Sequence, residues 1–378
     1  MTQRIVPPAR AYLPDSDITE IQGNVAKILK SGILTMGDFT REFEHQFSRV
    51  IGVKYAIAVS SGTSALEIAL RARGLKLGDE VIVPTNTFGA TAGAVVFAGG
   101  QPVIADISRS SMTIDAERVR RAITPKTKGV IAVHVGGLIC PEIDQIKEIC
   151  EERDLFLVED AAHAHGSKIG GRSAGALGSV GAFSFYPTKL MTSGEGGMIT
   201  TNDDEVASIA RILRDQGRED FSSNRIVMVG YNWRMPEISA AIGIVQLRRL
   251  PEFIERRNTL AKVYDRSIDL VDLERIHTPP NHLHNYYKYT YFLPKSVDRD
   301  NFKSICRDRG VFYGGEVYWP PVHQQPAYRK FLLAQSYFPI ADEWCSRLVN
   351  PPLFNNMTVD QAERVIEVTR QTLTELKK

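Results

Sequence analysis

The sequence predicts an α/β fold with a large, mostly parallel sheet that carries helices on both faces. Short apolar runs that suit buried strands alternate with stretches of helical period. Parallel strands need crossover helices, and these helices cover the sheet. The expected strands are 55–59, 80–83, 102–105, 128–133, 155–158 and 181–185, and the expected helices between them are 64–73, 90–98 and 143–153.

The length predicts a second, smaller domain. A chain of 378 residues is too long for one simple core. We expect a large domain over 1–250 and a small C-terminal α+β domain over 251–378. The other expected elements are helices 18–31 and 40–50, the latter N-capped by Thr40, a helical region 236–270, a strand-like run 287–293, a helix 300–309 and a terminal helix from 359.

Composition narrows the function classes. With 46 basic and 44 acidic side chains, the net charge of +2 gives no strong field for nucleic acid or an anionic membrane. The start lacks a signal core, and no run approaches the ~20 apolar residues of a membrane span, so we expect a cytoplasmic protein. The four cysteines, Cys140, Cys150, Cys306 and Cys345, lack the paired spacing of a zinc or redox site.

One lysine follows the end of an apolar strand. Strand 181–185 runs into the turn Tyr186-Pro187-Thr188-Lys189, and a glycine-rich loop comes next. An amine that is partly shielded from water at such a place loses proton affinity and becomes nucleophilic. Formation of a Schiff base is the chemistry that this favours. The alternative, an ordinary surface lysine in a polar turn, is commoner. Other residues of the chain must therefore distinguish the two interpretations.

Polar groups also follow other strands of the predicted sheet. Gly62, Thr63 and their serine neighbours open a helix, which suits either a phosphate or an ordinary N-cap. Asp160 follows strand 155–158 and either keeps a pyridine nitrogen protonated or caps a helix. Phe88 stacks on a flat ligand or belongs to the core, and Ser184 is a further phosphate donor. Because strand ends gather at one edge, this conjunction indicates one site.

A metal site is not expected. His163 and His165 are separated by one residue and lack further ligands at metal-binding spacing.

Five short motifs occur in a fixed order along the chain. They are Ser61-Gly62-Thr63-Ser64-Ala65-Leu66, Glu159-Asp160-Ala161-Ala162-His163-Ala164-His165-Gly166, Ser184-Phe185-Tyr186-Pro187-Thr188-Lys189, Gly194-Glu195-Gly196-Gly197 and Gly230-Tyr231-Asn232-Trp233-Arg234-Met235. In these motifs, and over nearly its whole length, the chain resembles the DegT/StrS family of sugar aminotransferases. Members of that family use pyridoxal phosphate (PLP) on the fold-type-I scaffold.

The resemblance implies a role for each motif residue. Lys189 would form a Schiff base with PLP and shuttle a proton, and Asp160 would pair with the pyridinium nitrogen. Phe88 would stack on the ring, and His163 would hydrogen-bond the phenolic oxygen.

Other residues would hold the cofactor's phosphate. Gly62, Thr63 and Ser184 would do so within one subunit. Asn232 would reach the phosphate of the neighbouring subunit, which implies a homodimer with shared active sites. A loop amide bound to its own backbone is the alternative for Asn232.

The substrate is left open by a departure from the family pattern. The family usually has glutamine where this chain has His163, and histidine there is similar to the aminohydroxybenzoate synthases. The Tyr-Pro-Thr before Lys189 is similar to the sugar enzymes instead. Tyr318 and His323 would contact the substrate, or belong to a packed turn, and Arg234 would hold the donor's carboxylate.

We therefore expect a transaminase that moves nitrogen from glutamate or glutamine to a keto group of a nucleotide-linked deoxysugar. The alternative is a PLP enzyme that acts on a carbocyclic ketone, such as an aminohydroxybenzoate synthase or a cyclitol aminotransferase. A non-catalytic regulator with the same fold is the third possibility. A lysine at position 189 argues against the family's sugar dehydratases, which have histidine there.

Overall fold

The computed structural model describes residues 5–220, 224–269, 273–332 and 336–376. Its centre is a seven-stranded sheet formed by β1 (Tyr55–Val59), β2 (Glu80–Pro84), β3 (Gln101–Ala105), β4 (Thr127–Val133), β5 (Phe156–Asp160), β8 (Val180–Ser184) and β9 (Gly197–Thr201). The strand order is β1-β9-β8-β5-β4-β2-β3, and only β9 runs against the others. The predicted, mostly parallel sheet is confirmed, but β9 was not expected.

Helices cover both faces of this sheet. One layer contains α3 (Gly62–Ala72), α4 (Gly89–Phe97) and α7 (Asp204–Arg214), and the other contains α6 (Ile143–Glu152). The short α5 (Ala116–Ala122) packs on α6. Successive strand residues point to opposite faces. In β1, for example, Ile57 lies in the core under α3 and Ala56 in the core on the other face.

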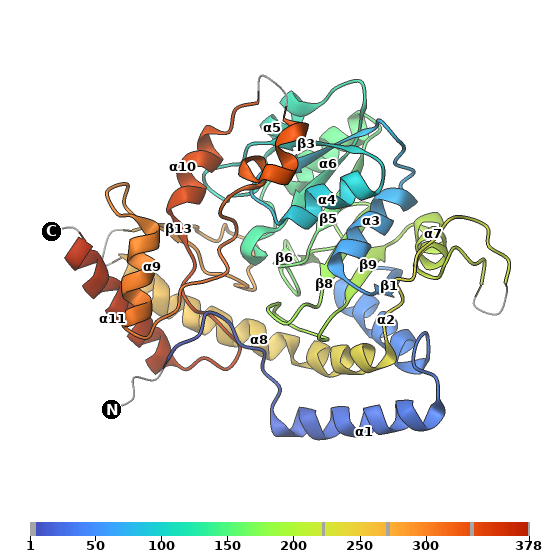
Figure 1. The fold of residues 1–378 in the computed structure, drawn as a ribbon, viewed down its shortest axis with the longest axis horizontal. Helices are drawn as coiled ribbons and strands as arrows, with labels where there is room; N and C mark the ends of the chain where they lie inside the picture. Colours follow the sequence, from blue (N-terminus) through green and yellow to red (C-terminus); the bar gives the residue numbers. More distant parts are fainter. Residues whose placement is uncertain (1–4, 221–223, 270–272, 333–335, 377–378) are drawn as a thin grey trace.

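The N-terminal helices pack against the long helix α8 (Glu237–Asp269). Figure 1 shows α1 (Asp15–Ser31) lying along α8, and α2 (Asp38–Ile51) contacts it as well. Thr40 was expected to be the N-cap of α2, but the helix begins at Asp38 and its N-cap is Gly37. The carboxylate of Glu237 instead accepts the amides of Gly37, Phe39 and Thr40, each at 2.9 Å. A buried charge from another helix therefore satisfies the free amides of this one.

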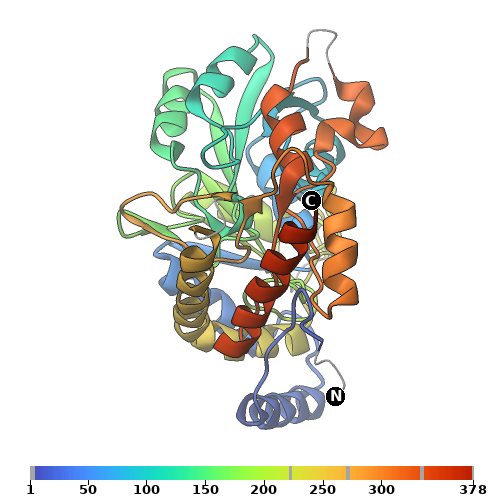
Figure 2. The same ribbon diagram turned by 90° about the vertical axis from the view of Figure 1, so that its left-hand side faces the viewer.

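The C-terminal part has its own small sheet and core. Strands β10 (Glu274–Arg275), β12 (Tyr291–Phe292) and β13 (Leu348–Val349) pair antiparallel, beside α9 (Arg299–Asp308), α10 (Pro339–Arg347) and α11 (Val359–Leu376). Figure 2 shows α9 and α11 side by side. A second small sheet joins β11 (His282–Leu283), β6 (Lys168–Ile169) and β7 (Arg172–Ser173).

The expected domain boundary falls inside α8. This helix passes residue 250 without a break, and Leu260 and Tyr264 from its second half lie in the C-terminal core. Val6 lies in the same core and pairs with Val311. The division at residue 250 thus stays a prediction, and the expected helix end at 270 lies outside the described residues. Among the described helices, no segment is long and apolar enough to cross a membrane.

Candidate active site

The predicted site residues lie at or just beyond the carboxyl ends of the sheet strands. Asp160 is the last residue of β5, and Ser184 is the last residue of the neighbouring β8. Lys189 follows Ser184, α3 begins directly after β1, and Phe88 precedes α4 after β2. Because these strands run in the same direction, residues far apart in sequence come together at their carboxyl ends.

The start of α3 forms a place for an anion. The hydroxyl of Ser61 accepts the Ser64 amide at 3.1 Å, and the Ser64 hydroxyl accepts the Ser61 amide at 3.0 Å. This capping box leaves the amides of Gly62 and Thr63 in the first turn, where a helix offers no acceptor. A Cβ added to Gly62 would lie 2.7 Å from the Cβ of Ser184. Free amides and the Ser184 residue thus meet where a phosphate would fit.

A chain of threonine hydroxyls fixes the carboxylate of Asp160. Thr91 donates to Oδ2 of Asp160 at 2.7 Å, and the Thr87 hydroxyl lies 2.6 Å from that of Thr91. The amide of Ala162 donates to Oδ1 at 3.2 Å. The carboxylate is buried, with 7% exposure. We did not anticipate these threonines: Thr91 lies in the first turn of α4, and Thr87 lies in the loop just before the helix.

Lys189 lies half-buried against an aromatic ring. Its ammonium is 5.1 Å from the ring centroid of Tyr287, and its amide closes a turn by donating to Tyr186 O at 2.9 Å. The hydroxyls of Thr188 and Tyr287 are 3.2 Å apart. Tyr287 was not identified from the sequence, because it belongs to a distant segment whose spacing carries no signal for this site.

His163 is neutral, with its hydrogen on Nε2. Burial, followed by the charge of Lys189, holds the pKa of His163 well below its usual range. The Gly136 amide donates to Nδ1 at 3.3 Å, so Nε2 carries the hydrogen in the neutral ring. Nε2 lies 2.8 Å from the Tyr318 hydroxyl, and the imidazole stacks on Tyr287 with a centroid distance of 4.3 Å. This histidine is therefore a fixed neutral donor, as a glutamine would be.

Phe88 stands exposed rather than in the core. Its side chain is 63% exposed, and its ring centroid is 6.0 Å from that of Tyr318. The amide of Tyr318 donates to Oδ1 of Asn86 at 2.6 Å, which ties the C-terminal loop to the end of β2. Both rings thus lie beside the strand ends, with that of Tyr318 half-buried.

Arg234 already has an internal partner. Its guanidinium donates to Asp215 at 2.6 Å, in an ion pair that is mostly buried. This arrangement does not support a role for Arg234 in binding the amino donor, because its guanidinium already pairs with the carboxylate of Asp215.

His323 is likewise occupied. Its Nδ1 lies 2.6 Å from the Thr85 hydroxyl and its Nε2 lies 2.8 Å from Asp342. The ring is 8% exposed and stacks on Phe338. The packed-turn alternative fits this residue better than substrate contact.

Asn232 lies on the surface of the segment that follows α7. It is exposed, and its neighbours Tyr231 and Trp233 stack at 3.7 Å. The backbone of Trp233 accepts the Ser60 amide at 2.8 Å, which fixes this segment beside β1. The amide side chain therefore faces away from the core.

The remaining polar residues of the Asp160 motif are structural. Glu159 is fully buried and accepts from His134 Nε2 and from the amides of Gly175, Leu177 and Gly178. His165 packs between the rings of Phe183 and Phe185, and burial lowers its pKa to about 3. Over the described residues, no cluster of three or more His, Cys, Asp or Glu side chains is placed to bind a metal.

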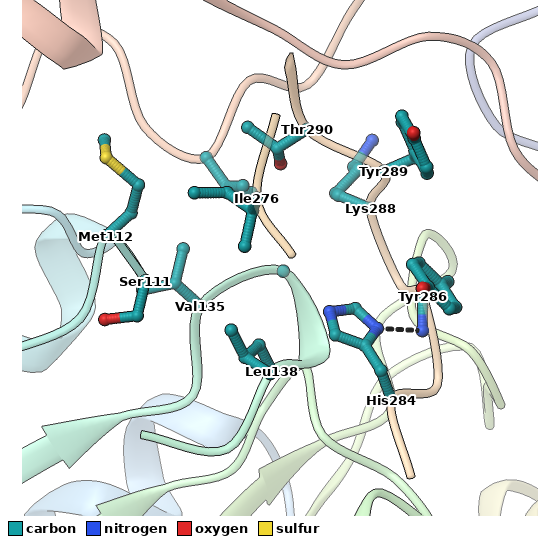
Figure 3. A pocket seen from close by; sticks show the side chains of 12 residues that line it. Ser111, Met112, Val135, Leu138, Ile276, His284, Tyr286, Lys288, Tyr289 and Thr290 are labelled. Carbon is teal, nitrogen blue, oxygen red and sulfur yellow. Dashed lines mark hydrogen bonds between the residues drawn. The ribbon is translucent and has the colours of Figure 1, made fainter. Parts of the chain in front are cut away.

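A small cavity lies on the other side of the turn Val135–Gly137. Figure 3 shows Met112, Leu138, Ile276 and His284 around it, with the Tyr286 amide donating to His284 Nδ1 at 2.6 Å. Its volume of about 20 Å³ holds roughly one water molecule. A cofactor or substrate therefore has no room there.

The residues at the sheet edge fit PLP. The start of α3 suits its phosphate, the fixed carboxylate of Asp160 suits a protonated ring nitrogen, and Lys189 supplies the amine.

Comparisons with known proteins agree with this geometry. Residues 15–370 match the DegT/DnrJ/EryC1/StrS aminotransferase family. The chain is 36% identical to the GDP-perosamine synthase of Caulobacter vibrioides, over 90% of this chain and 92% of that protein. It superposes on S. venezuelae DesV, solved with a ketimine intermediate, with a TM-score of 0.91 and 31% identity, over 98% and 99% of the two chains. The Streptococcus pneumoniae protein Spr1654 in its PLP form gives a TM-score of 0.91 and 25% identity, over 98% and 99%.

The family match, the fold and the site lead to one assignment. The chain belongs to the DegT/DnrJ/EryC1/StrS aminotransferase family and is a PLP-dependent aminotransferase of fold type I.

Proposed function

We propose that this enzyme transfers an amino group from glutamate or glutamine to a keto group of a nucleotide-linked deoxysugar. The observation that carries the proposal is the meeting of Lys189, Asp160 and the start of α3 at one sheet edge. The similarity to a relative named GDP-perosamine synthase supports a nucleotide-linked acceptor. A cytoplasmic location stays a prediction.

The residues of the site divide the work by position. PLP, when bound, supplies an electron sink for the substrate carbon. The Nζ atom of Lys189 is the group that takes a proton from one carbon and returns it to another. Asp160, held by Thr91, keeps the positive charge on the ring nitrogen. The Nε2–H of His163, which lies 2.8 Å from the Tyr318 hydroxyl, would be a neutral donor for an oxygen on the ring when PLP is bound.

We also propose that two subunits share each site. Asn232 is exposed, and nearby Ile226, Val227 and Val229 expose 66%, 42% and 90% of their surfaces. A cluster of exposed apolar side chains on one segment suits a protein interface.

Mixing two inactive variants tests the shared site. Lys189→Ala and Asn232→Ala, mixed and allowed to exchange subunits, should recover about a quarter of wild-type activity, since half of the dimers gain one intact site. Activity that stays at the level of the separate variants would contradict sharing.

The acceptor is tested with ¹⁵N-labelled glutamate and glutamine. A panel of keto-sugar nucleotides and carbocyclic ketones is offered to the PLP enzyme, with Lys189→Ala as the control. Label in a nucleotide-linked amino sugar supports the proposal. Label in a carbocyclic product supports the alternative, which His163 favours because aminohydroxybenzoate synthases have histidine there. A cofactor that binds but never accepts nitrogen would indicate a regulator.

A further inference from the structure

We propose that Tyr287 is a positioning residue that holds Lys189 and His163 in place for the reaction. This inference rests on the proposed role of Lys189 as the amine that carries the cofactor. Tyr287 lies in a segment far from both residues in sequence, and its ring is 6% exposed. The same ring contacts both of them.

The ring is suited to a cation and to an imidazole together. The Lys189 ammonium lies 5.1 Å from the Tyr287 centroid, within the range of a cation–π interaction. The His163 ring stacks on Tyr287 with an interplanar angle of 29°. Without this ring, the side chain of Lys189 and the imidazole of His163 would each lose the contact that the C-terminal part of the chain provides.

The backbone around Tyr287 is tied to the loop that carries His163. Asn285 Oδ1 accepts the Tyr287 amide at 2.9 Å. Asn285 Nδ2 donates to the carbonyl oxygens of His163 and His165, at 2.8 and 3.0 Å. A Cβ on Gly137 would lie 1.9 Å from Asn285 Oδ1, so only glycine fits beside it. One asparagine thus sets the spacing between Tyr287 and the strand-end loop.

A second tie runs through the turn at Gly136. The Lys288 amide donates to the Gly136 carbonyl at 2.9 Å, and the Gly136 amide donates to His163 Nδ1. The buried Arg257 donates to the carbonyl oxygens of Tyr286 and Tyr287 from the other side. The small cavity of Figure 3 lies against this turn. These hydrogen bonds fix the backbone at Tyr287 and therefore the position from which its ring reaches Lys189 and His163.

The electrostatics of the phenol agree with this placement. Burial raises the pKa of Tyr287, but the charges of Lys189 and Lys288, with the Thr188 hydroxyl, bring it below its usual value. Lys288 Nζ lies 5.5 Å from the same ring. The other ionisable groups that sense the charge of Lys189 are His163, His165 and Lys288, and burial disfavours the charged form of each. Tyr287 is thus the acidic group that faces the amine.

The first test compares Tyr287→Leu, Tyr287→Phe and a control, Tyr289→Leu, in the PLP-loaded enzyme. Tyr289 belongs to the same segment, but its hydroxyl binds Asp265 at 2.7 Å, away from Lys189. The leucine at 287 should lower the pH midpoint of the cofactor's visible absorbance band by about one unit and weaken its visible circular dichroism, because the ring no longer stabilises the cation. Phenylalanine should restore most of both signals.

Two results would overturn the inference. One is a folded Tyr287→Leu enzyme with the wild-type midpoint and dichroism. The other is an equal change in all three variants, which would show a general effect of the segment. If the wild-type protein shows no visible band with PLP, the proposed function fails instead.

A second measurement does not depend on the folding of a Tyr287 variant or on bound cofactor. NMR of ring-labelled tyrosine follows the ionisation of Tyr287 in the cofactor-free wild type and in Lys189→Met. Loss of the ammonium should raise the pKa of Tyr287, because the charge of Lys189 lowers it. An unchanged Tyr287 titration would contradict contact between the two side chains.

Discussion

The cofactor edge of the sheet and the loops predicted to contact substrate differ in how their polar groups are satisfied. At the edge, the amides of Gly62 and Thr63 and the amine of Lys189 point to a place for a ligand. In the loops, Arg234 is bound by Asp215, and His323 by Thr85 and Asp342. Arg234 and His323 therefore contribute to stability through internal partners, whereas the amides of Gly62 and Thr63 and the amine of Lys189 are available to a ligand.

The largest expected effect is at the cofactor edge. Lys189→Ala should lower the rate of amino transfer by about 10²–10⁴-fold or more, because the proton shuttle is lost. Lys147→Ala, which removes a surface lysine that pairs with Glu151, is the control and should leave the rate unchanged. Single-turnover spectra after addition of glutamate measure the effect. Near-normal turnover by Lys189→Ala would place the chemistry elsewhere.

A second effect concerns the threonines behind Asp160. Thr91→Val removes a donor to the buried carboxylate and should weaken PLP binding by about ten- to a hundredfold, the value of a hydrogen bond to a charged group. Thr87→Val removes only the next hydroxyl in the chain and should cost less. Equilibrium titration with PLP compares them. An equal loss of PLP affinity in both variants would contradict the prediction that the direct donor, Thr91, matters more than Thr87.

The two histidines of one motif extend the comparison. His165 has no hydrogen-bond partner for either ring nitrogen among the described residues, and its folded pKa is about 3, whereas an unfolded histidine titrates near about 6.5. Its neutral form therefore stabilises the fold fully above pH 6.5, and this contribution is lost as the pH falls towards 3, by about 1.4 kcal/mol per unit.

His165→Phe should accordingly flatten the loss of stability between pH 6.5 and 4.5, as measured by urea unfolding, about 2 kcal/mol in all. His45 is exposed, so His45→Asn is the matched control and should leave the pH profile as it is. A profile that His165→Phe does not alter would show that acid unfolding depends on other groups.

The next prediction distinguishes two roles for Arg234, which are binding of the amino donor's carboxylate and pairing with Asp215. Arg234→Gln leaves the carboxylate of Asp215 without its guanidinium partner and should cost about 1–3 kcal/mol of folding stability, since the Arg234 side chain keeps some contact with water. The KM for glutamate should stay the same, because the side chain already binds an internal carboxylate. Denaturant unfolding and steady-state kinetics together measure this. A raised KM with unchanged stability would restore the donor-binding role that the resemblance implied.

The smallest effect is expected for His163→Gln. The amide N–H replaces the Nε2–H donor, so PLP binding should weaken by only a few-fold, through lost stacking on Tyr287. His163→Ala should weaken it more, and PLP titration distinguishes the two. Equal losses would show that the donor is not used.

The sequence predicts the sheet and its edge well, because strand ends are fixed by the period of the apolar pattern and by chain direction. Asp160 and Ser184 end neighbouring strands for that reason. Contacts between distant segments have no such pattern. Tyr287 and Asn285 reach the site through an unpredicted fold of the C-terminal segment, and the cap on α2 comes from Glu237, far along the chain.

The chemistry assigned to Lys189 is tested most directly by reducing the PLP-loaded enzyme with borohydride and mapping the modified peptide by mass spectrometry. The added mass should lie on Lys189. A modified lysine elsewhere in the chain, or no modification in protein that has bound PLP, would contradict it.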